Sequence, residues 1–571
     1  MHHFIVSALG LCAASAWAQS STVDVTTESP IARAGVLANI GPDGSKSSGA
    51  YPGVVIASPS TTNPDYLYTW VRDSSLVFKE LIDQYTSCQD TALRTLIDNF
   101  VMAEANLQQV PNPSGTVSTG GLGEPKFNID ESAFTGPWGR PQRDGPALRS
   151  TAVITYANWL IANGNFSYVI STLWPMIQLD LDYVANNWNQ TTFDLWEEVD
   201  SSSFFTTAVQ HRALRQGAAL ANAIGRKSVV SRYTTQAQNI LCFLQSYWNP
   251  SPGYVTANTG GGRSGIDANT VLASIHTFDV DAGCDATTFQ PCSDKALSNL
   301  KTYVDSFRRI YSINFGIPAN QAVATGRYPE DVYQGGNPWY LTTFAVAEQL
   351  YDALIVWQAQ GYIQVTSTSL GFFQQFNPSL TIGVYASSSS IYTSLISAIR
   401  SFADGFVATA AKYTPSDGRL SEQYSRFNGN PLSAVDLTWS YASTLTAFTA
   451  RAGQTSASWG ALGLTVSSSC LTSDMATVSV QFNVGATTVL GENIYLTGSV
   501  GALSNWDTST AILMSSSSYP TWSTTVNLPA NIGIEYKYIR IKNGAVTWES
   551  DPNNAFTTVA SAVQTLNDSW R

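Results

Sequence analysis

Charge is scarce in this chain. Only 12% of its 571 residues are charged, and 29 basic residues face 41 acidic ones, for a net charge of −12. The basic residues are scattered and form no basic run, so the electrostatic footprint of a nucleic-acid-binding protein is missing. Beyond the N-terminal segment, no apolar run approaches the roughly 20 residues that a membrane span needs. We therefore expect neither nucleic acid nor membrane as a partner.

Side chains for nucleophilic, metal and phosphate chemistry are also sparse. Outside the N-terminal segment the only histidines are His211 and His276, each within a helical pattern where a core or surface role is expected. The cysteines are too far apart for a zinc knuckle. The clusters "TGGLGEP" and "TGGGRSG" lack the Lys-Ser/Thr of a P-loop and the strand-to-helix context of a dinucleotide site, so they are interpreted as loops. We expect no metal and no cofactor.

The first residues have the pattern of a cleaved secretory signal. In "MHHFIVSALGLCAASAWA" an apolar run ends in the small-x-small motif of residues 16–18, although His2 and His3 stand where Lys or Arg is usual. Residues 1–18 are therefore interpreted as a signal peptide, and the mature protein is expected to be secreted and extracellular.

An oxidising compartment favours disulfides. Cys12 would leave with the signal peptide, and the odd number of remaining cysteines means that at least one is free or pairs between chains. Cys284 and Cys292 bracket a short polar loop that a disulfide would close readily. Glycosylation sequons begin at Asn165, Asn189 and Asn567.

Aromatic side chains, in contrast, are abundant. The chain has 16 Trp and 26 Tyr, many beside Gly, Asn or Ser. Flat amphipathic rings on a polar background suit sugars, because a pyranose presents C–H groups for stacking and hydroxyls for hydrogen bonds. For most of these rings the simpler interpretation, filling a large core, is expected to hold.

The hydrophobic pattern divides the chain into two domains. Residues 75 to 455 have a helical periodicity interrupted by long loops, with about twelve helical stretches and no fixed-period repeat, which favours a closed ring over a solenoid. After residue 472, short alternating runs such as "TVSVQFNV" and "IEYKYIRI" indicate a small β-sandwich. The predicted boundaries are 19–470, a very short linker at 471–475, and 476–571.

Five loop segments join charged residues to Trp or Tyr: "PDYLYTWVRD", "FTGPWGRPQRDGP", "DLWEEVD", "GRYPEDVYQGGNPWY" and "GRLSEQYSRFNG". Glycoside hydrolysis needs one protonated and one ionised carboxyl group. In "DLWEEVD" four carboxylates stand beside Trp196, and such crowding hinders ionisation, which suits a general acid. Taken alone, the same segment also fits a helix N-terminus, where acids are favoured.

These segments closely resemble the fungal glucoamylases of glycoside hydrolase family 15, over about residues 31 to 470. The terminal segment, with "GENIYLTGS", "EYKYIRI" and "WESDPN", resembles the starch-binding modules of carbohydrate-binding family 20. The resemblance implies an all-α (α/α)6 barrel followed by an all-β sandwich. It also implies inverting hydrolysis that releases β-glucose from non-reducing ends of starch and maltodextrins, more slowly at α-1,6 branches.

The resemblance also assigns site residues. Glu197 would be the general acid and Glu422 the general base that activates water. The substrate-binding residues it implies are Tyr66, Trp70, Arg72, Asp73, Trp138, Leu195, Glu198, Arg327, Trp339, Gln423 and Trp439.

Asp194 has also been described in this family as the proton acceptor. In a helical turn, Asp194 and Glu197 would have Cβ atoms about 5 to 6 Å apart, whereas an inverting pair needs roughly 6.5 to 9.5 Å to admit water. We therefore expect Asp194 to support Glu197 electrostatically and Glu422 to be the base.

In the terminal module, the resemblance implies two starch sites. The first comprises Trp506, Glu535, Lys537, Trp548 and Asn553. The second comprises Tyr519 and Trp522, and is expected to be weaker because Leu490 stands where the family often has Tyr.

Two departures from the family pattern concern the linker and the cysteines. The long Ser/Thr-rich linker is nearly missing, so a fixed or narrowly hinged module is expected. The module's usual disulfide cannot form, so Cys470 is expected to pair with Cys242, leaving Cys88 free.

Two other functions stay open. One is another (α/α)6 inverting hydrolase, of the trehalase or glucodextranase type. The other is a secreted starch-binding protein without catalysis, against which the intact Glu197 and Glu422 argue. Nothing in the sequence requires more than a monomer.

Overall fold

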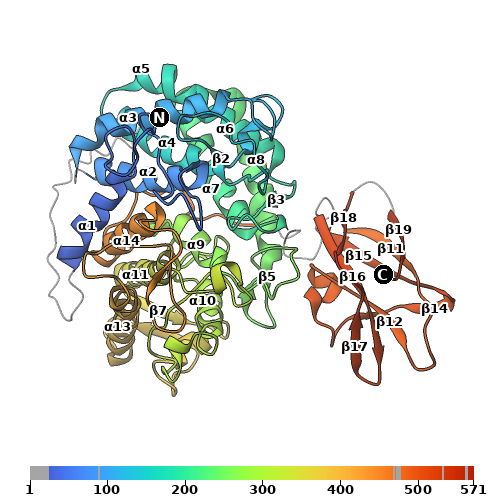
Figure 1. The fold of residues 1–571 in the computed structure, drawn as a ribbon. Helices are drawn as coiled ribbons and strands as arrows, with labels where there is room; N and C mark the ends of the chain where they lie inside the picture. The colour runs from blue at the N-terminus through green and yellow to red at the C-terminus, as the bar shows by residue number, and fades with distance from the viewer. Residues whose placement is uncertain (1–24, 88–89, 467–469, 471–476, 530–532, 560–563) are drawn as a thin grey trace, which may run out of the picture.

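The computed structural model describes residues 25–87, 90–466, 470, 477–529, 533–559 and 564–571. The predicted signal peptide, Cys88 and the predicted linker at 471–475 lie outside these residues. Figure 1 shows a large helical domain with a small domain of strands beside it.

Six helices form a closed inner ring in which each contacts the next and the last contacts the first. They are α2 (Val71–Thr86), α4 (Gly145–Ala162), α7 (Phe204–Ala223), α9 (Asn269–His276), α11 (Tyr340–Gln360) and α14 (Thr438–Arg451). Six outer helices pair with them one to one. These are α1 (Val25–Ala38), α3 (Arg94–Gln109), α6 (Trp174–Asn187), α8 (Lys227–Leu244), α10 (Asp294–Ser306) and α13 (Ser390–Lys412). The predicted (α/α)6 barrel is confirmed.

The sequence pattern separates the two layers. Inner helix α11 is buried along most of its length, since other helices surround it, and its apolar residues lie all round. Outer helix α13 buries one stripe that includes Leu395, Ile399, Phe402 and Phe406, and its other face meets solvent. None of the described helices is both long and apolar enough to span a bilayer.

The loops that lead from an outer helix into an inner one gather at one end of the barrel. Several contain short antiparallel strand pairs: β1 (Thr69–Trp70) with β2 (Lys126–Phe127), β3 (Thr192–Phe193) with β4 (Asp200–Ser201), and β9 (Gln423–Tyr424) with β10 (Pro431–Leu432). Trp70 and Trp339 are the N-cap residues of α2 and α11. The segments that join charge to aromatic rings therefore meet at the N-terminal ends of the inner helices.

The small domain consists of two packed sheets. One has the order β14-β15-β11-β19, and the other β13-β12-β16-β17 with β18 also paired to β16. Their bounds are β11 (Thr477–Gly485), β12 (Asn493–Gly498), β13 (Ile512–Leu513), β14 (Ser515–Ser518), β15 (Thr521–Pro529), β16 (Gly533–Lys542), β17 (Ala545–Trp548), β18 (Asn554–Thr557) and β19 (Gln564–Ser569). Phe482 of one sheet meets Tyr536 and Phe556 of the other, so the predicted β-sandwich is confirmed.

Two disulfides lie within the described part of the helical domain. Cys284 bonds to Cys292, and Cys242 bonds to Cys470, as predicted. The second bond ties the segment after α14 back to outer helix α8.

A second cavity, of about 720 Å³, lies at the other end of the barrel. Glu80, Glu348 and Asp352 line it, and all three are buried. Burial raises the pKa of each carboxyl group above its usual value, and the neighbouring acids add to this for Glu348 and Asp352. The folded state therefore keeps protons that the unfolded chain, with pKa values of about 4.3 for Glu and about 3.9 for Asp, releases at lower pH.

We expect the stability that these three groups contribute to fall as the pH rises. A folded-state pKa above the unfolded one gives stability that is complete below about pH 4 and is lost as the pH rises through the folded-state pKa. The unfolding midpoint should be at least about 2 °C lower at pH 8 than at pH 5. Differential scanning calorimetry of wild type and Glu348→Gln tests this, since the variant should show a smaller change. If the unfolding midpoint changes with pH by the same amount in both proteins, Glu348 does not contribute to the pH dependence of stability.

Candidate active site

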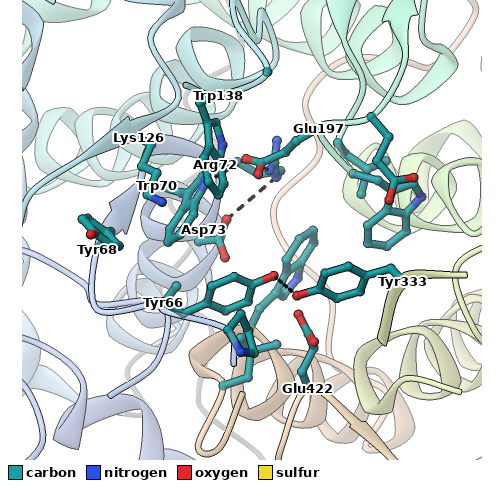
Figure 2. Close-up of a pocket in the computed structure, with 18 of the residues that line it drawn as sticks. Tyr66, Tyr68, Trp70, Arg72, Asp73, Lys126, Trp138, Glu197, Tyr333 and Glu422 are labelled. Carbon is teal, nitrogen blue, oxygen red and sulfur yellow. Dashed lines mark hydrogen bonds and ion pairs between the residues drawn. The ribbon is translucent and has the colours of Figure 1, made fainter. Parts of the chain in front are cut away.

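A cavity of about 630 Å³ opens at the N-terminal end of the inner ring (Figure 2). Twelve of the fourteen residues predicted for the catalytic domain line it: Tyr66, Trp70, Arg72, Asp73, Trp138, Leu195, Glu197, Glu198, Arg327, Trp339, Glu422 and Trp439. Asp194 and Gln423 do not. The cavity therefore unites residues that the sequence separates by more than 300 positions.

The stretch from Asp194 to Val199 forms the tight connection of the β3–β4 hairpin and not a helical turn. The Asp194 N–H donates to the Val199 carbonyl at 3.0 Å, and Glu197 has φ of 67°, a left-handed conformation that costs a non-glycine residue energy. The prediction of a helical turn is wrong because these hairpin bonds replace the helical ones. The spacing argument about Asp194 and Glu197 therefore loses its geometric basis.

Asp194 is fully buried, and it holds this hairpin together. Its Oδ1 accepts the N–H groups of Glu198 and Val199 at 2.9 and 3.1 Å, and its Oδ2 accepts the Asn258 amide at 2.9 Å. Burial raises the pKa of Asp194, and the two backbone donors partly offset this. Both oxygens face protein donors, so Asp194 shapes the site without lining it.

Glu197 points into the cavity and receives three hydrogen bonds on a single oxygen. Trp70 Nε1, Gln142 Nε2 and Arg72 Nη2 lie 2.7, 3.1 and 3.3 Å from Oε1. None of the hydrogen bonds within the described residues uses Oε2. A proton on this carboxyl group therefore belongs on Oε2, where it is available to a bound molecule.

The other acids of the segment face different partners. Glu198 bonds to Arg263 and Arg327 at 2.7 and 2.9 Å and to the Tyr328 hydroxyl. Although burial acts in the opposite direction, Arg327, Tyr328 and Arg263 hold the pKa of Glu198 below its usual value. Asp200 is exposed. The four carboxylates are crowded in sequence but have separate surroundings in space.

Glu422 lies across the cavity from Glu197 (Figure 2). It is almost fully buried, and Ser433 and Gln423 donate hydrogen bonds to its Oε2. Burial raises the pKa of Glu422 to about 7, while the Ser433 hydroxyl, Arg327 and other donors act to lower it. These donors favour the ionised carboxylate that a general base needs.

Gln423 orients Glu422 and is not available to a sugar. Its side chain is fully buried, with Nε2 bonded to Glu422 and Oε1 accepting from Asn337 at 3.1 Å. The structure therefore does not place Gln423, predicted to bind substrate, among the residues that line the cavity. Gln423 forms a β-bridge with Trp339. Because side chains alternate between the two faces of an extended segment, that of Gln423 points away from the cavity.

Ser433 allows a test of Glu422 as the predicted base. Its φ of 65° suits glycine, so Ser433→Gly removes the hydroxyl without backbone strain. Losing a donor to the carboxylate raises the pKa of Glu422, and the acidic limb of the kcat/KM profile should move about 1 unit toward higher pH. The measurement is the pH dependence of kcat/KM on maltose, and an unmoved acidic limb would contradict the role of Ser433.

Two arginines are fixed in the wall. Arg72 Nη1 contacts Gln142 and Asp144 at 2.8 and 2.9 Å, and Arg327 bonds to Asp331 through two nitrogens at 2.6 and 2.9 Å. Burial raises the pKa of neighbouring Asp73 to about 7, against the opposing effect of Arg72. Rigid guanidinium groups beside carboxyl groups suit the hydroxyls of a sugar.

Sequence reasoning missed several residues of this wall. Tyr333 and Tyr66 share a hydrogen bond of 2.8 Å between their hydroxyls. Lys126 stands among four rings, 3.5 Å from the Trp138 centroid, and burial lowers the pKa of its ammonium group to about 8. Tyr333 belongs to the charged and aromatic segment "GRYPEDVYQGGNPWY", so the sequence could have indicated it. Lys126 follows "TGGLGEP" and carries no such signal.

The residues predicted for the first starch site lie together in the sandwich. Trp548 is 43% exposed, and its ring centroid lies 6.4 Å from that of Trp506. Lys537 is buried beneath, bonded to Asp551 and, at 3.3 Å, to the Glu549 carbonyl. Glu535 and Asn553 bond to each other at 2.8 Å.

Of the two residues predicted for the second starch site, only Tyr519 is exposed. Tyr519 is 51% exposed, but Trp522 is 3% exposed and donates its indole N–H to the Ala486 carbonyl. The prediction that Trp522 stacks on a sugar is wrong, because its ring packs into the sandwich core. Leu490, in the position where an aromatic residue was expected, is 98% exposed.

Two further predictions concern the surface and metals. The sequon residues Asn165, Asn189 and Asn567 are all exposed, as glycan attachment requires. Within the part of the chain that the structure describes, no three His, Cys, Asp or Glu side chains are grouped so as to hold a metal ion.

Known proteins share both domains. The profile of glycosyl hydrolases family 15 matches residues 30–449, and that of the starch binding domain matches residues 477–568. A glucoamylase-1 from Schizophyllum commune is 63% identical, with 99% of this chain and 98% of that protein aligned. A Neurospora crassa glucoamylase is 48% identical, with 96% of this chain and 94% of that protein aligned. A solved Hypocrea jecorina family 15 glucoamylase superposes with a TM-score of 0.76 at 50% identity, covering 96% and 99%. On these findings, and on the barrel and cavity just described, the chain belongs to glycosyl hydrolase family 15 and carries a starch binding domain.

Proposed function

We propose that this protein is a starch-degrading glucoamylase that removes single glucose units, with inversion, from non-reducing ends of starch and malto-oligosaccharides. The observation that carries this is a pair of carboxyl groups, Glu197 and Glu422, on opposing walls of one aromatic-lined cavity (Figure 2). Inverting hydrolysis needs such a pair with room for water between sugar and base.

Each carboxyl group has surroundings that suit one role. Glu197 keeps Oε1 occupied by Trp70, Arg72 and Gln142, so the Oε2 proton is the one transferred to the departing glycosidic oxygen. Glu422, in the ionised form that the Ser433 and Gln423 donors favour, removes a proton from the attacking water. The water attacks the face opposite the leaving group, so the released glucose has the β configuration.

The wall residues bind and orient the sugar. Arg72, Asp73 and Arg327 hold hydroxyls of the terminal glucose, and Trp138, Trp339 and Trp439 shape the cavity around it. Leu195 and Glu198 lie where the next sugar would extend. Asp194 fixes the hairpin that presents Glu197 and Glu198.

The test is glucose release from soluble starch, followed by polarimetry. We expect glucose as the product and its β anomer first. Hydrolysis of trehalose or dextran in preference to maltose would favour the other (α/α)6 hydrolases, and binding without glucose release would favour a non-catalytic starch-binding protein.

We also propose the domain boundaries of the chain and the location of the protein. The boundaries are residues 19–470 for the catalytic domain, 471–475 for the linker and 476–571 for the starch-binding module, after a signal peptide at 1–18. The protein is secreted, acts outside the cell as a monomer, and needs no cofactor. Small-angle scattering should fit a compact pair of domains, and a widely swinging pair would contradict this.

The module should bind glucans mainly through Trp548. Trp548→Ala is expected to weaken β-cyclodextrin binding about tenfold, as truncating an exposed aromatic anchor does. Tyr519→Ala is the matched control, because Tyr519 is similarly exposed but stands in the incomplete second site, and it should change the affinity less than about threefold. Titration calorimetry on the full chain measures both, and a larger loss for Tyr519→Ala would contradict the assignment.

A further inference from the structure

The β-sandwich module contacts the catalytic domain through residues of its first starch site. Glu535 Oε2 accepts the Gly261 N–H at 3.0 Å and the Asn553 amide at 2.8 Å. Next to this contact, a Cβ added at Gly533 would lie 2.7 Å from Thr191 Cγ2, so β16 lies directly against the residue that precedes β3. Figure 1 shows the module beside the part of the barrel that carries β3 and β5 (Trp248–Asn249).

Gly261 belongs to the loop 258–264, which is anchored at both ends. Asn258 donates to Asp194 at 2.9 Å, and the Ser264 N–H donates to Glu330 Oε1 at 2.9 Å. Between the anchors stand three glycines. A Cβ at Gly260 would lie 3.1 Å from both Glu535 and Ser201, so the backbone here is sandwiched between the module and the catalytic hairpin.

This glycine run leaves few side-chain contacts to hold the middle of the loop. Gly261 has φ of 91°, and a Cβ there would lie 2.7 Å from Val199 of the hairpin. Glycine allows this close approach but adds backbone freedom. The Glu535 carboxylate supplies an external acceptor that restrains the loop at its centre.

Two residues further on, Arg263 reaches the active site. Its Nη2 lies 2.7 Å from Glu198 Oε2, and its guanidinium carbon lies 3.9 Å from the Tyr328 ring centroid. Glu198 lines the catalytic cavity. A continuous set of contacts therefore runs from Glu535 through Gly261 and Arg263 to Glu198.

We propose that the starch-binding module is a working part of the catalytic wall: Glu535, supported by Asn553, positions Arg263, and Arg263 positions Glu198 for the second sugar. Arg263 and Glu535 are positioning residues here. The proposal deepens the proposed function and rests on it, and it gives Glu535 and Asn553 a role in catalysis beside starch binding.

A double-mutant cycle tests the chain of contacts. Glu535→Ala and Arg263→Ala should each raise the KM for maltose about fivefold with little change in kcat, as lost substrate positioning does. If Glu535 acts through Arg263, the double variant will be no worse than Arg263→Ala alone. Glu535→Gln keeps an acceptor oxygen and should restore most of the wild-type KM. If the KM increases of the two single variants multiply in the double variant, the proposal is overturned. A wild-type KM in Glu535→Ala would overturn it as well.

A second variant moves the module without altering any sugar-binding residue. Gly533→Val places a branched side chain against Thr191, and it should raise the maltose KM as Glu535→Ala does. Adding Thr191→Gly to this variant makes room again and should lower the KM toward wild type. The matched control is Gly485→Val, in the same module, where a Cβ would meet only the Asp568 carbonyl at 3.9 Å and the KM should stay unchanged.

The outcomes separate this proposal from the proposed function. If Gly533→Val keeps a wild-type KM and binds starch granules, the positioning role is overturned. The proposed function would stand in that case, because the wild type still releases glucose. If Gly533→Val loses granule binding, the module has unfolded and the double-mutant cycle decides. No glucose release from maltose by the wild type would instead overturn the proposed function.

Discussion

Replacing Glu197 with glutamine is expected to lower kcat on maltose by about 10³-fold, within the range that general acid catalysis contributes. The glutamine oxygen can still accept the bonds from Trp70, Arg72 and Gln142, so the side chain should keep its position. What it lacks is the proton that leaves Oε2. The KM should therefore change little, and steady-state kinetics separates the two constants.

The control for this variant lies in the same segment. Asp200→Asn also removes a carboxylate from "DLWEEVD", but Asp200 is exposed and lies outside the cavity, so activity should stay at the wild-type level. Equal losses in the two variants would mean that the charge of the whole segment matters, and not one acid.

Replacing Glu422 with glutamine is expected to lower kcat by a similar factor of about 10³. The amide fills the same space beside Ser433 and Gln423 but accepts no proton from the attacking water. The KM on maltose should again stay close to that of the wild type. Near-full turnover would contradict the assignment of the base.

Asp194→Asn is the matched comparison for Glu422→Gln. Its carboxylate binds two backbone N–H groups and the Asn258 amide, so the substitution should mainly lower the unfolding temperature. We expect its kcat to fall less than about tenfold. A loss as large as that of Glu422→Gln, in a protein that stays folded, would favour Asp194 as the proton acceptor.

The barrel could be predicted from sequence because helical periodicity is strong where one face is buried. Stretches such as that of α13 repeat apolar residues at i and i+4. The number of such helical stretches matched that of a closed ring. The active site could also be predicted, because charged and aromatic residues are concentrated in the loops that lead into the inner helices. Such composition marks which loops matter, but not how their side chains point.

The local geometry of the site left weaker marks in the sequence. The left-handed Glu197 and Ser433 belong to residue types that give no hint of positive φ, and tertiary contacts fix them. The family resemblance implied a sugar contact for Gln423, although alternation in an extended segment turns the side chains of neighbours such as Glu422 and Gln423 apart.

Trp522 shows an error that the sequence could have prevented. In "TWSTTVNL" the residues Trp522, Val526 and Leu528 share one face of a strand, and that face packs into the core. Period-two alternation therefore indicated burial, and the family resemblance obscured it. The three glycines of "TGGGRSG" show the reverse case, since they are a loop, as predicted, but one placed between the two domains.

The central claim is that Glu197 gives a proton to the leaving group and Glu422 takes one from water. Hydrolysis of α-glucosyl fluoride tests it directly, because fluoride departs with little protonation while water still needs a base. We expect Glu197→Gln to recover most of the wild-type rate on this substrate and Glu422→Gln to remain impaired. Recovery by Glu422→Gln, with Glu197→Gln still impaired, would contradict it.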